Sequence, residues 1–174
     1  VNTTDHTVTI TVDDVDEAPV FSSGSTASVA ENQTAAYTAA AADDEGTVLT
    51  YSLSGTDAAL FSIDAGTGVV TFNAAPDYEN PGDAGGDNVY DIVVSASDGV
   101  NTTDQAVAIT VTDENDNAPV FTSGATAPVA ENQTAAYTAT ATHADATSTA
   151  SYSLSVFDSA LFAITSSLRF VPRP

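Results

Sequence analysis

The chain repeats itself, and the period of the repeat fixes the size of its folding unit. Residues 29–38 recur without change as residues 129–138, residues 51–54 recur as 152–155, and Pro19 and Pro119 lie 100 residues apart. Solenoid proteins repeat every 20 to 50 residues or so, whereas about 100 residues is the size of one small domain. We therefore expect a row of separately folded domains rather than one large domain.

The same period predicts where the domains begin and end. Residues 1–17 are expected to be the last strand and linker of a preceding repeat, and residues 18–117 a complete repeat with its C-terminal linker. Residues 118–174 are expected to be the N-terminal part of a further, truncated repeat. No apolar run approaches the roughly 18 residues that indicate a membrane-spanning helix, and neither end reads as a targeting signal.

The chain is strongly acidic, which restricts the kinds of molecule that it is expected to bind. The chain has 24 acidic and 2 basic residues, a formal net charge of −22, which excludes nucleic acid and anionic membranes as expected partners and favours cations. With 43% hydrophobic residues it can still build cores. It has no cysteine, so disulfides and thiolate metal sites are excluded, and a bound metal is another way to stabilise a small secreted domain. The alternative, that the acids only solvate the surface, explains less well why they cluster at the repeat junctions.

Strand patterns dominate the complete repeat. Runs rich in valine, threonine and aromatic residues occur at 48–53, 60–63, 69–72, 89–94 and 106–111, with glycine-rich and aspartate-rich turns between them. About seven short strands in about 100 residues predict an all-β fold of tandem antiparallel Greek-key β-sandwiches. The expected core includes Leu53, Phe61, Ile63, Val70, Ile92, Val94 and Ile109.

Residues 113–117 read Asp-Glu-Asn-Asp-Asn and are followed by Ala118 and Pro119. Carboxylate, amide and backbone carbonyl oxygens are the ligands of Ca²⁺, which takes about six to eight of them. Pro119 fixes the exit direction of the chain, as suits a junction between domains. The run therefore predicts half of a calcium site, to which the flanking domains supply the remaining ligands, and residues 14–19 repeat it in a weaker form.

Two other readings of these acids fit less well. An EF-hand loop starting at Asp113 needs glycine at its sixth position and glutamate at its twelfth, where this chain has Ala118 and Gly124. The carboxylates of Asp77 and Glu79 could in principle serve glycoside hydrolysis, but a metal cage explains why they occur together with linker acids. With two histidines and no cysteine, we expect no enzyme.

The linker Asp113-x-Asn115-Asp116-Asn117-Ala118-Pro119 resembles that of cadherin repeats, in particular the cadherin-like repeats of large bacterial surface and adhesin proteins. The resemblance covers nearly the whole chain. Outside the linker, the resemblance rests on four features. Glu31 resembles the family's early glutamate ligand, Asp77 and Glu79 form an Asp-x-Glu element, and Asp98 resembles its late aspartate. Residues 43–45 and 143–145 lie where the family has an Asp-x-Asp element.

The resemblance implies that one repeat, the linker and the next repeat converge on a row of calcium ions. At the second junction it implies the ligands Glu31, Asp77, Glu79, Asp113, Glu114, Asn115, Asp116, the carbonyl of Asn117, and Asp145, with His143 at the place of an aspartate. At the first junction it implies Asp14, Asp16, Glu17, Asp43, Glu45 and Asp98. The first linker is one residue shorter and is interpreted as lacking a counterpart of Asn117, so a full set of ions is not predicted there. Imidazole is a poor calcium ligand, so we expect the outer ion beside His143 to bind weakly, unless the ring points into solvent.

The implied function is a calcium-rigidified extracellular stalk, part of a larger secreted or surface-anchored adhesion protein. Its expected partners are calcium ions and the neighbouring repeats of the same chain. The alternative is a binding module whose surfaces contact a like chain, a different cell-surface protein or a polysaccharide. Tryptophan is absent and most of the tyrosines and phenylalanines fall at core-like positions, which favours the stalk.

Overall fold

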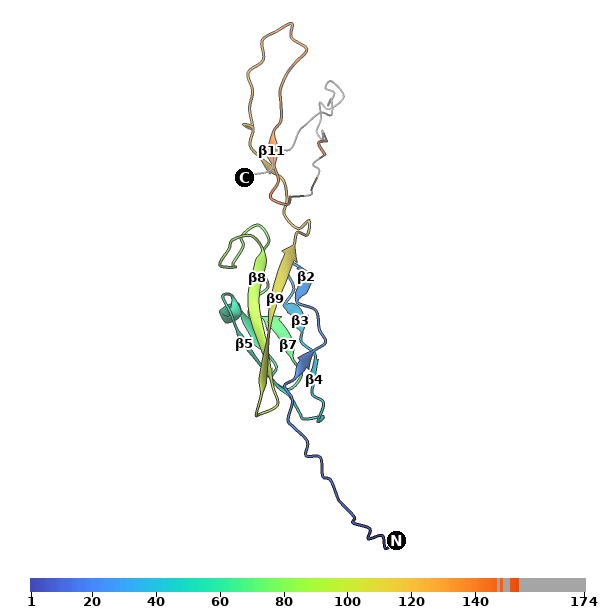
Figure 1. The fold of residues 1–174 in the computed structure, drawn as a ribbon. Helices are drawn as coiled ribbons and strands as arrows, with labels where there is room; N and C mark the ends of the chain where they lie inside the picture. Colours follow the sequence, from blue (N-terminus) through green and yellow to red (C-terminus); the bar gives the residue numbers. More distant parts are fainter. Residues whose placement is uncertain (147, 149–150, 154–174) are drawn as a thin grey trace.

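The computed structural model describes residues 1–146, 148 and 151–153 (Figure 1). One β-sandwich accounts for most of the regular structure. Its first sheet has four strands in the order β2 (Thr26–Ala30), β9 (Thr102–Thr112), β8 (Val89–Ser97) and β5 (Thr50–Ser54). Its second sheet has three, in the order β3 (Ala35–Thr38), β7 (Val69–Phe72) and β6 (Phe61–Ile63). The all-β fold is as predicted, with one short 3₁₀ turn, Ala58–Leu60, between β5 and β6.

The core lies between the two sheets and follows from the alternation of the strands. In β8 the inward positions are Tyr90, Ile92, Val94 and Ala96, all buried, while the intervening residues face outward. Phe61, Phe72 and Tyr90 pack together with ring centroids 4.4 to 5.8 Å apart, and Tyr90 meets both phenylalanines edge to face. Of the predicted core, Phe61, Val70, Ile92, Val94 and Ile109 are buried, and Leu53 and Ile63 are partly buried against them.

One strand pair departs from the antiparallel pattern. The strands β2 and β9 run parallel, with Thr26 opposite Ala108 and Ala30 opposite Thr112. The cause is a switch of sheet near the start of the repeat, because the preceding strand β1 (Val20–Phe21) pairs antiparallel with β4 (Ala41–Ala42) instead. The backbone N–H groups of Ser22 and Ser23 both donate to the carbonyl of Ala40 at this turn.

The beginning of the next repeat has the same geometry. The strand β10 (Val120–Phe121) pairs with β11 (Ala141–Thr142) in the register of β1 and β4. Asn32 and its counterpart Asn132 both have a φ of 63°. The rest of the predicted further repeat, from residue 154 on, lies outside the described residues.

Residues 1–17 form no strand and extend away from the end of the sandwich opposite to the linker (Figure 1). Val8, Ile10 and Val12 are exposed to 68%, 83% and 90%. Their counterparts one repeat later, on β9, are fully buried, because β8 and β2 flank that strand. That residues 1–12 are the last strand of a preceding repeat stays a prediction.

Two buried acids brace the long loop at residues 80–88. Asp57 accepts the backbone N–H groups of Ala84 at 2.8 Å and Asp91 at 2.7 Å. Desolvation raises the pKa of the Asp83 carboxyl, but hydrogen bonds from backbone N–H groups, chiefly those of Asp87 and Asn88, outweigh it and leave the pKa below its ordinary value. These acids therefore hold the loop and do not belong to the junction. In the described part of the chain, no helix has the length and hydropathy to cross a membrane.

Candidate metal centre

Glu31 anchors the second junction. It directly follows β2, is only 2% exposed, and its carboxylate accepts two backbone N–H groups from different segments. Tyr78 donates to Oε2 at 2.8 Å and Glu114 donates to Oε1 at 2.9 Å. The buried carboxylate therefore joins the Asp-Tyr-Glu loop and the linker to the end of β2.

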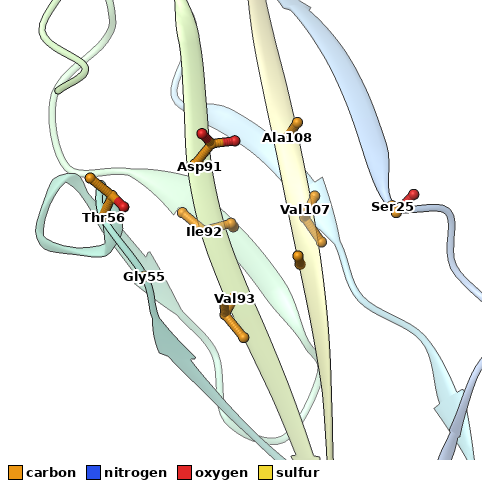
Figure 2. Close-up of a pocket in the computed structure, with 9 residues that line it drawn as sticks. Ser25, Gly55, Thr56, Asp91, Ile92, Val93, Val107 and Ala108 are labelled. Atoms are coloured by element: carbon orange, nitrogen blue, oxygen red, sulfur yellow. The ribbon is translucent and has the colours of Figure 1, made fainter. Parts of the chain in front are cut away.

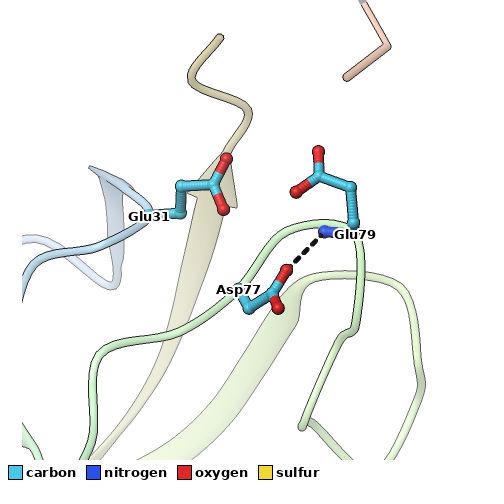
Figure 3. Close-up of side chains that lie close together, drawn as sticks. All are labelled: Glu31, Asp77 and Glu79. Atoms are coloured by element: carbon cyan, nitrogen blue, oxygen red, sulfur yellow. Dashed lines mark hydrogen bonds between the residues drawn. The ribbon is translucent and has the colours of Figure 1, made fainter. Parts of the chain in front are cut away.

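Asp77 and Glu79 lie beside Glu31 on the loop that follows β7 (Figure 3). The Asp77 carboxylate accepts the N–H groups of Glu79 at 3.1 Å and Asn80 at 3.2 Å, a local turn that fixes the direction of the loop. One oxygen from each of Glu31, Asp77 and Glu79 lies within 4.8 Å of the others. Calcium binds oxygens at about 2.3 to 2.6 Å, so ligands on opposite sides of one ion are about 5 Å apart. The three oxygens thus have a spacing that fits a calcium ion.

A second group of oxygens adjoins the first and shares Glu79. Glu79, Asp113 and Asp145 also bring one oxygen each within 4.8 Å of one another. These residues come from the base of the complete repeat, the linker and the start of the next repeat. Asp145 is 5% exposed, and its Oδ2 lies 3.3 Å from Nδ1 of His143. The two groups suit adjacent ions bridged by Glu79.

The crowding of acids has electrostatic consequences. Desolvation, the charge of Glu31 and the contact with the Asp113 carboxyl raise the pKa of Glu79 to about 7. Desolvation also acts on Asp145, but hydrogen bonds from Asn117 and the proximity of His143 leave its pKa lowered. Glu79 therefore binds a proton readily at neutral pH, and a bound cation would replace that proton.

The remaining linker residues take different places. Asp116 accepts the side-chain amide of Asn32 through Oδ2, and Asn115 Oδ1 accepts the hydroxyl of Ser148 at 3.2 Å. Glu114 reaches the site through its backbone N–H, and its side chain is exposed. The structure brings Asp116 and Glu114 to the junction, but their carboxylates do not belong to the two tight groups of carboxylate oxygens.

The acids predicted for the first junction also converge. Desolvation, followed by the charges of Asp98, Asp43, Glu17 and Asp14, raises the pKa of Asp16. Asp43 and Asp98 each use Oδ1 to accept backbone N–H groups of their own loops. Their Oδ2 atoms are shielded from solvent and accept no hydrogen bond within the described residues, which suits a cation. Among those residues, however, three carboxylate oxygens lie within 4.8 Å of one another only at the second junction.

Glu17 occupies a place at the first junction that corresponds to that of Asn117 at the second. A side-chain contact with Glu17 is the main cause that raises the pKa of Glu45 to about 7. Glu45 is the counterpart of Asp145, whose partner is Asn117. The sequence interpretation left Asn117 without a counterpart, whereas counting back from Pro19 and Pro119 places Glu17 at the position of Asn117.

Two residues that the sequence analysis did not assign to the junctions hold the linkers. Asn32 donates from Nδ2 to Asp116, and Asn101 donates from Nδ2 to Asp16 Oδ2 at 3.0 Å. Their recurrence in the repeat, as Asn132 and Asn2, was the available signal. It does not reveal the partner of either amide.

A shallow depression lies outside both junctions, on the outer face of the four-stranded sheet (Figure 2). Its lining consists of backbone and small side chains from β8, β9 and the turn after β5, with Asp91 as its one carboxylate. A Cβ on Gly55 would lie 2.9 Å from the backbone nitrogen of Val93, so the close approach here requires glycine. The depression has no group of converging ligands.

Comparisons with known proteins point to one family. No protein-family model matches the chain. Mouse cadherin-related family member 2 is 37% identical over 81 residues, which are 47% of this chain and 6% of that protein. The chain thus spans a small part of this curated relative.

Solved structures give the same result at the level of the fold. Human protocadherin-24 EC1-2 matches with 27% identity and a TM-score of 0.61 over 75% of this chain and 62% of that one. Mouse cadherin-23 EC22-24 matches with 26% identity and a TM-score of 0.62, over 75% of this chain and 45% of that one. Drosophila N-cadherin EC1-4 matches with 26% identity and a TM-score of 0.58, over 75% of this chain and 34% of that one. Similarity of sequence and similarity of fold together support the cadherin-domain family for this chain.

Proposed function

We propose that this chain is a calcium-binding segment of tandem cadherin-like repeats, and that calcium stiffens the stalk which these repeats form in an extracellular, cell-surface adhesion protein. The observation that carries the proposal is the sharing of Glu79 between two groups of carboxylate oxygens. Those oxygens come from one repeat, the linker and the next repeat. Binding there couples the orientation of the two repeats.

The chemistry of the donors supports calcium in particular. The groups consist of carboxylates, the hard oxygen ligands that calcium prefers, and the chain has no cysteine. Glu31, Asp77 and Glu79 would hold one ion, and Glu79, Asp113 and Asp145 a second. A bound ion supplies positive charge at the point where these carboxylates repel one another.

Repulsion between the carboxylates explains why calcium would stiffen the junction. Two unit charges about 4 Å apart repel by about 1 kcal/mol in water and by about 4 kcal/mol at an effective dielectric constant of 20. Several such pairs meet at the second junction, while the sandwich at residues 18–112 has its own core. Calcium is therefore expected to change the angle and mobility between repeats more than the content of β-structure.

The test is small-angle scattering and thermal melting of the full chain in calcium and in excess chelator. We expect a narrower distribution of shapes and a higher melting temperature in calcium, because a ligand that binds only the folded protein stabilises it by about 2.7 kcal/mol at 100 times its Kd. Magnesium at the same concentration is the matched control. Scattering and melting curves that chelator leaves unchanged would contradict the proposal.

The second candidate is a repeat whose own surface makes the adhesive contact, with a like chain, another cell-surface protein or a polysaccharide. The depression beside Asp91 is the feature that favours it (Figure 2). Against it, Phe61, Phe72 and Tyr90 are buried in the core, which leaves few aromatic side chains for a binding surface. Cell-binding assays and glycan arrays with the full chain distinguish the two functions.

Three further expectations remain predictions from the sequence. The relatives reported above come from mouse, human and fly, so a closer relationship to bacterial surface proteins is a prediction. The extracellular location and the lack of enzyme activity are predictions as well. Sequencing the gene around this segment tests the first two through the flanking domains and signals, and activity assays on glycosides test the third.

A further inference from the structure

We propose that the depression on the outer face of the four-stranded sheet binds a lysine or arginine side chain of a different, basic protein. The proposal deepens the second candidate function, in which the surface of a repeat makes the adhesive contact, and it rests on that function. It does not depend on calcium at the junctions. The shape of the depression, its single carboxylate and the charge of the chain carry the inference.

The depression lies over the neighbouring strands β8 and β9 and has a volume of about 330 Å³. Val93 is opposite Ala106 in the antiparallel ladder, and both face outward. Asp91 is opposite Ala108 on the same face. The turn after β5 bounds the depression on one side and Ser25, just before β2, bounds it on the other (Figure 2). Apart from Asp91, the side chains that line it are small or apolar, and none is aromatic.

The backbone fixes the position of the Asp91 carboxylate. The buried Asp57 donates its backbone N–H to the carbonyl of Asp91 at 3.1 Å, and its Oδ2 accepts the N–H of Asp91 at 2.7 Å. The side chain of Asp91 is exposed, and it accepts no hydrogen bond from the residues that the structure describes. The carboxylate is therefore held on a rigid strand and is available to a donor from another molecule.

A long cationic side chain fits this combination of surfaces. Lysine and arginine lay an apolar stem along apolar surface and keep the charged end in a polar environment. The stem can lie on Val93, Ala106 and Ala108 while the charged end reaches Asp91. A metal ion would need several oxygen ligands, whereas the lining has one carboxylate. A purely apolar group would cover Asp91 without pairing its charge, which is unfavourable.

The charge of the chain selects the kind of partner. No lysine, arginine or histidine occurs between His6 and His143, so the surface of the complete repeat offers no cation to a second copy. The two arginines, Arg169 and Arg173, lie outside the described residues. An anionic polysaccharide would be repelled, and a neutral sugar finds no aromatic ring to stack on. A net charge of −22 attracts basic proteins over a distance. The chemistry therefore favours a basic protein.

Nuclear magnetic resonance of the ¹⁵N-labelled full chain, saturated with calcium, tests the site. The probes are the acetylated methylamides of lysine and arginine, and the corresponding derivative of glutamine is the neutral control. We expect the two cationic probes to shift the amide signals of Thr56, Val93, Ala106 and Ala108 in a saturable manner. The glutamine derivative should not shift them.

Three variants separate the contributions to binding. Asp91→Asn should weaken it by about threefold or more, the scale of an exposed ion pair. Ala106→Leu fills the depression but keeps the carboxylate, and it should weaken binding as well. Asp104→Asn is the matched control, since it removes an exposed carboxylate from the same face of β9 outside the depression, and it should keep the parent affinity. Thermal melting in calcium checks that each variant stays folded.

Equal affinities of Asp91→Asn and Asp104→Asn would overturn the proposal, because the probes would then respond only to the overall negative charge. Equal binding of the glutamine derivative, or shifts confined to the linkers, would also overturn it. So would a dimer in analytical ultracentrifugation that Asp91→Asn abolishes, because the occupant would then be a second copy. Calcium titration of the same samples tests the stalk separately. A chain that binds no calcium would count against the stalk, whereas absent shifts at the depression would count only against this site.

Discussion

Asn32 donates from Nδ2 to Oδ2 of Asp116 at 2.6 Å, across 84 residues of sequence. The bond ties the turn after β2 to the linker that leaves the same repeat. At the first junction the corresponding linker residue, Asp16, is held by Asn101 from the repeat that follows it. Both linker aspartates are therefore oriented by an asparagine of the complete repeat, one from each of its ends.

The first prediction concerns this pair at the second junction. Asn32→Gly removes the amide while keeping a residue that tolerates the φ of 63°, so backbone strain does not confuse the result. We expect calcium affinity to fall several-fold, because Asp116 loses its orientation, while the melting temperature in chelator changes little. Calorimetric titration of the single variants and of Asn32→Gly with Asp116→Ala measures the coupling. Additive losses in the double variant would show that the two residues act separately.

Asp116→Ala is predicted to be the most damaging single substitution in the second linker. It removes a charge and a candidate ligand, and it also removes an acceptor of both Asn32 and Asn117. Titration should show fewer bound ions and a lower affinity than in the parent chain. Glu114→Ala is the matched control, since its carboxylate is exposed and only its backbone N–H reaches Glu31. If Asp116→Ala binds as many calcium ions as the parent chain, Asp116 is not a calcium ligand.

The pKa of Glu79, raised to about 7, predicts a dependence on pH. The folded protein binds a proton here more tightly than the unfolded chain does, so without calcium the stability falls as the pH rises from about 4.5 to about 7. Calcium competes with the same proton, and its affinity should therefore rise over that range. Melting and titration at several pH values measure both trends. In Glu79→Gln we expect a flatter pH profile together with weaker calcium binding, and an unchanged profile would assign the effect to another group.

His143→Asp should tighten the weakest calcium site of the second junction. Nδ1 of His143 lies 3.3 Å from Asp145, a candidate ligand, and a protonated ring would bring positive charge beside the ion. The acid in its place adds an oxygen ligand and removes that charge. Titrations between pH 5 and 7 should show higher affinity and a smaller effect of pH in the variant. Identical curves for the two proteins would place residue 143 outside the coordination shell.

Asp57→Ala is predicted to destabilise the sandwich without affecting the junctions. The substitution leaves the backbone N–H groups of Ala84 and Asp91 without their acceptor, and because both bonds are only partly buried the cost is about 1 kcal/mol for each. Chemical denaturation in chelator measures the loss, and Asp104→Ala, on the exposed face of β9, is the control. A calcium affinity equal to that of the parent is expected. Equal stability of the two variants would contradict the bracing role.

The sequence predicted the strands that alternate clearly and missed those that do not. The runs that became β5 to β9 are rich in valine and aromatic residues, and the structure places a strand in each. The strands β2 and β3 consist largely of alanine, serine and threonine, whose small contrast in polarity gives little periodicity. The parallel pairing of β2 with β9 joins residues 82 positions apart, and no local pattern specifies it.

The candidate site was predictable in its residues but not in its internal contacts. The family resemblance named Glu31, Asp77, Glu79, Asp113 and Asp145, and the structure brings their oxygens together in two groups. Their role as calcium ligands stays a prediction. The positions of the amides of Asn32, Asn101 and Asn117 depend on how the ends of separate segments meet. Composition and spacing do not contain that information.

The parallel alignment of β2 and β9 also bears on how the repeat responds to mechanical force. The chain enters at one end of the sandwich and leaves at the other (Figure 1), so a pull on the two ends of the repeat draws β2 and β9 in opposite directions. Their ladder, from Thr26 opposite Ala108 to Ala30 opposite Thr112, lies along that pull. Its hydrogen bonds are then sheared together instead of opening one after another from an end. A fold that connects its two ends through such a ladder resists stretching well even though each of its bonds is weak.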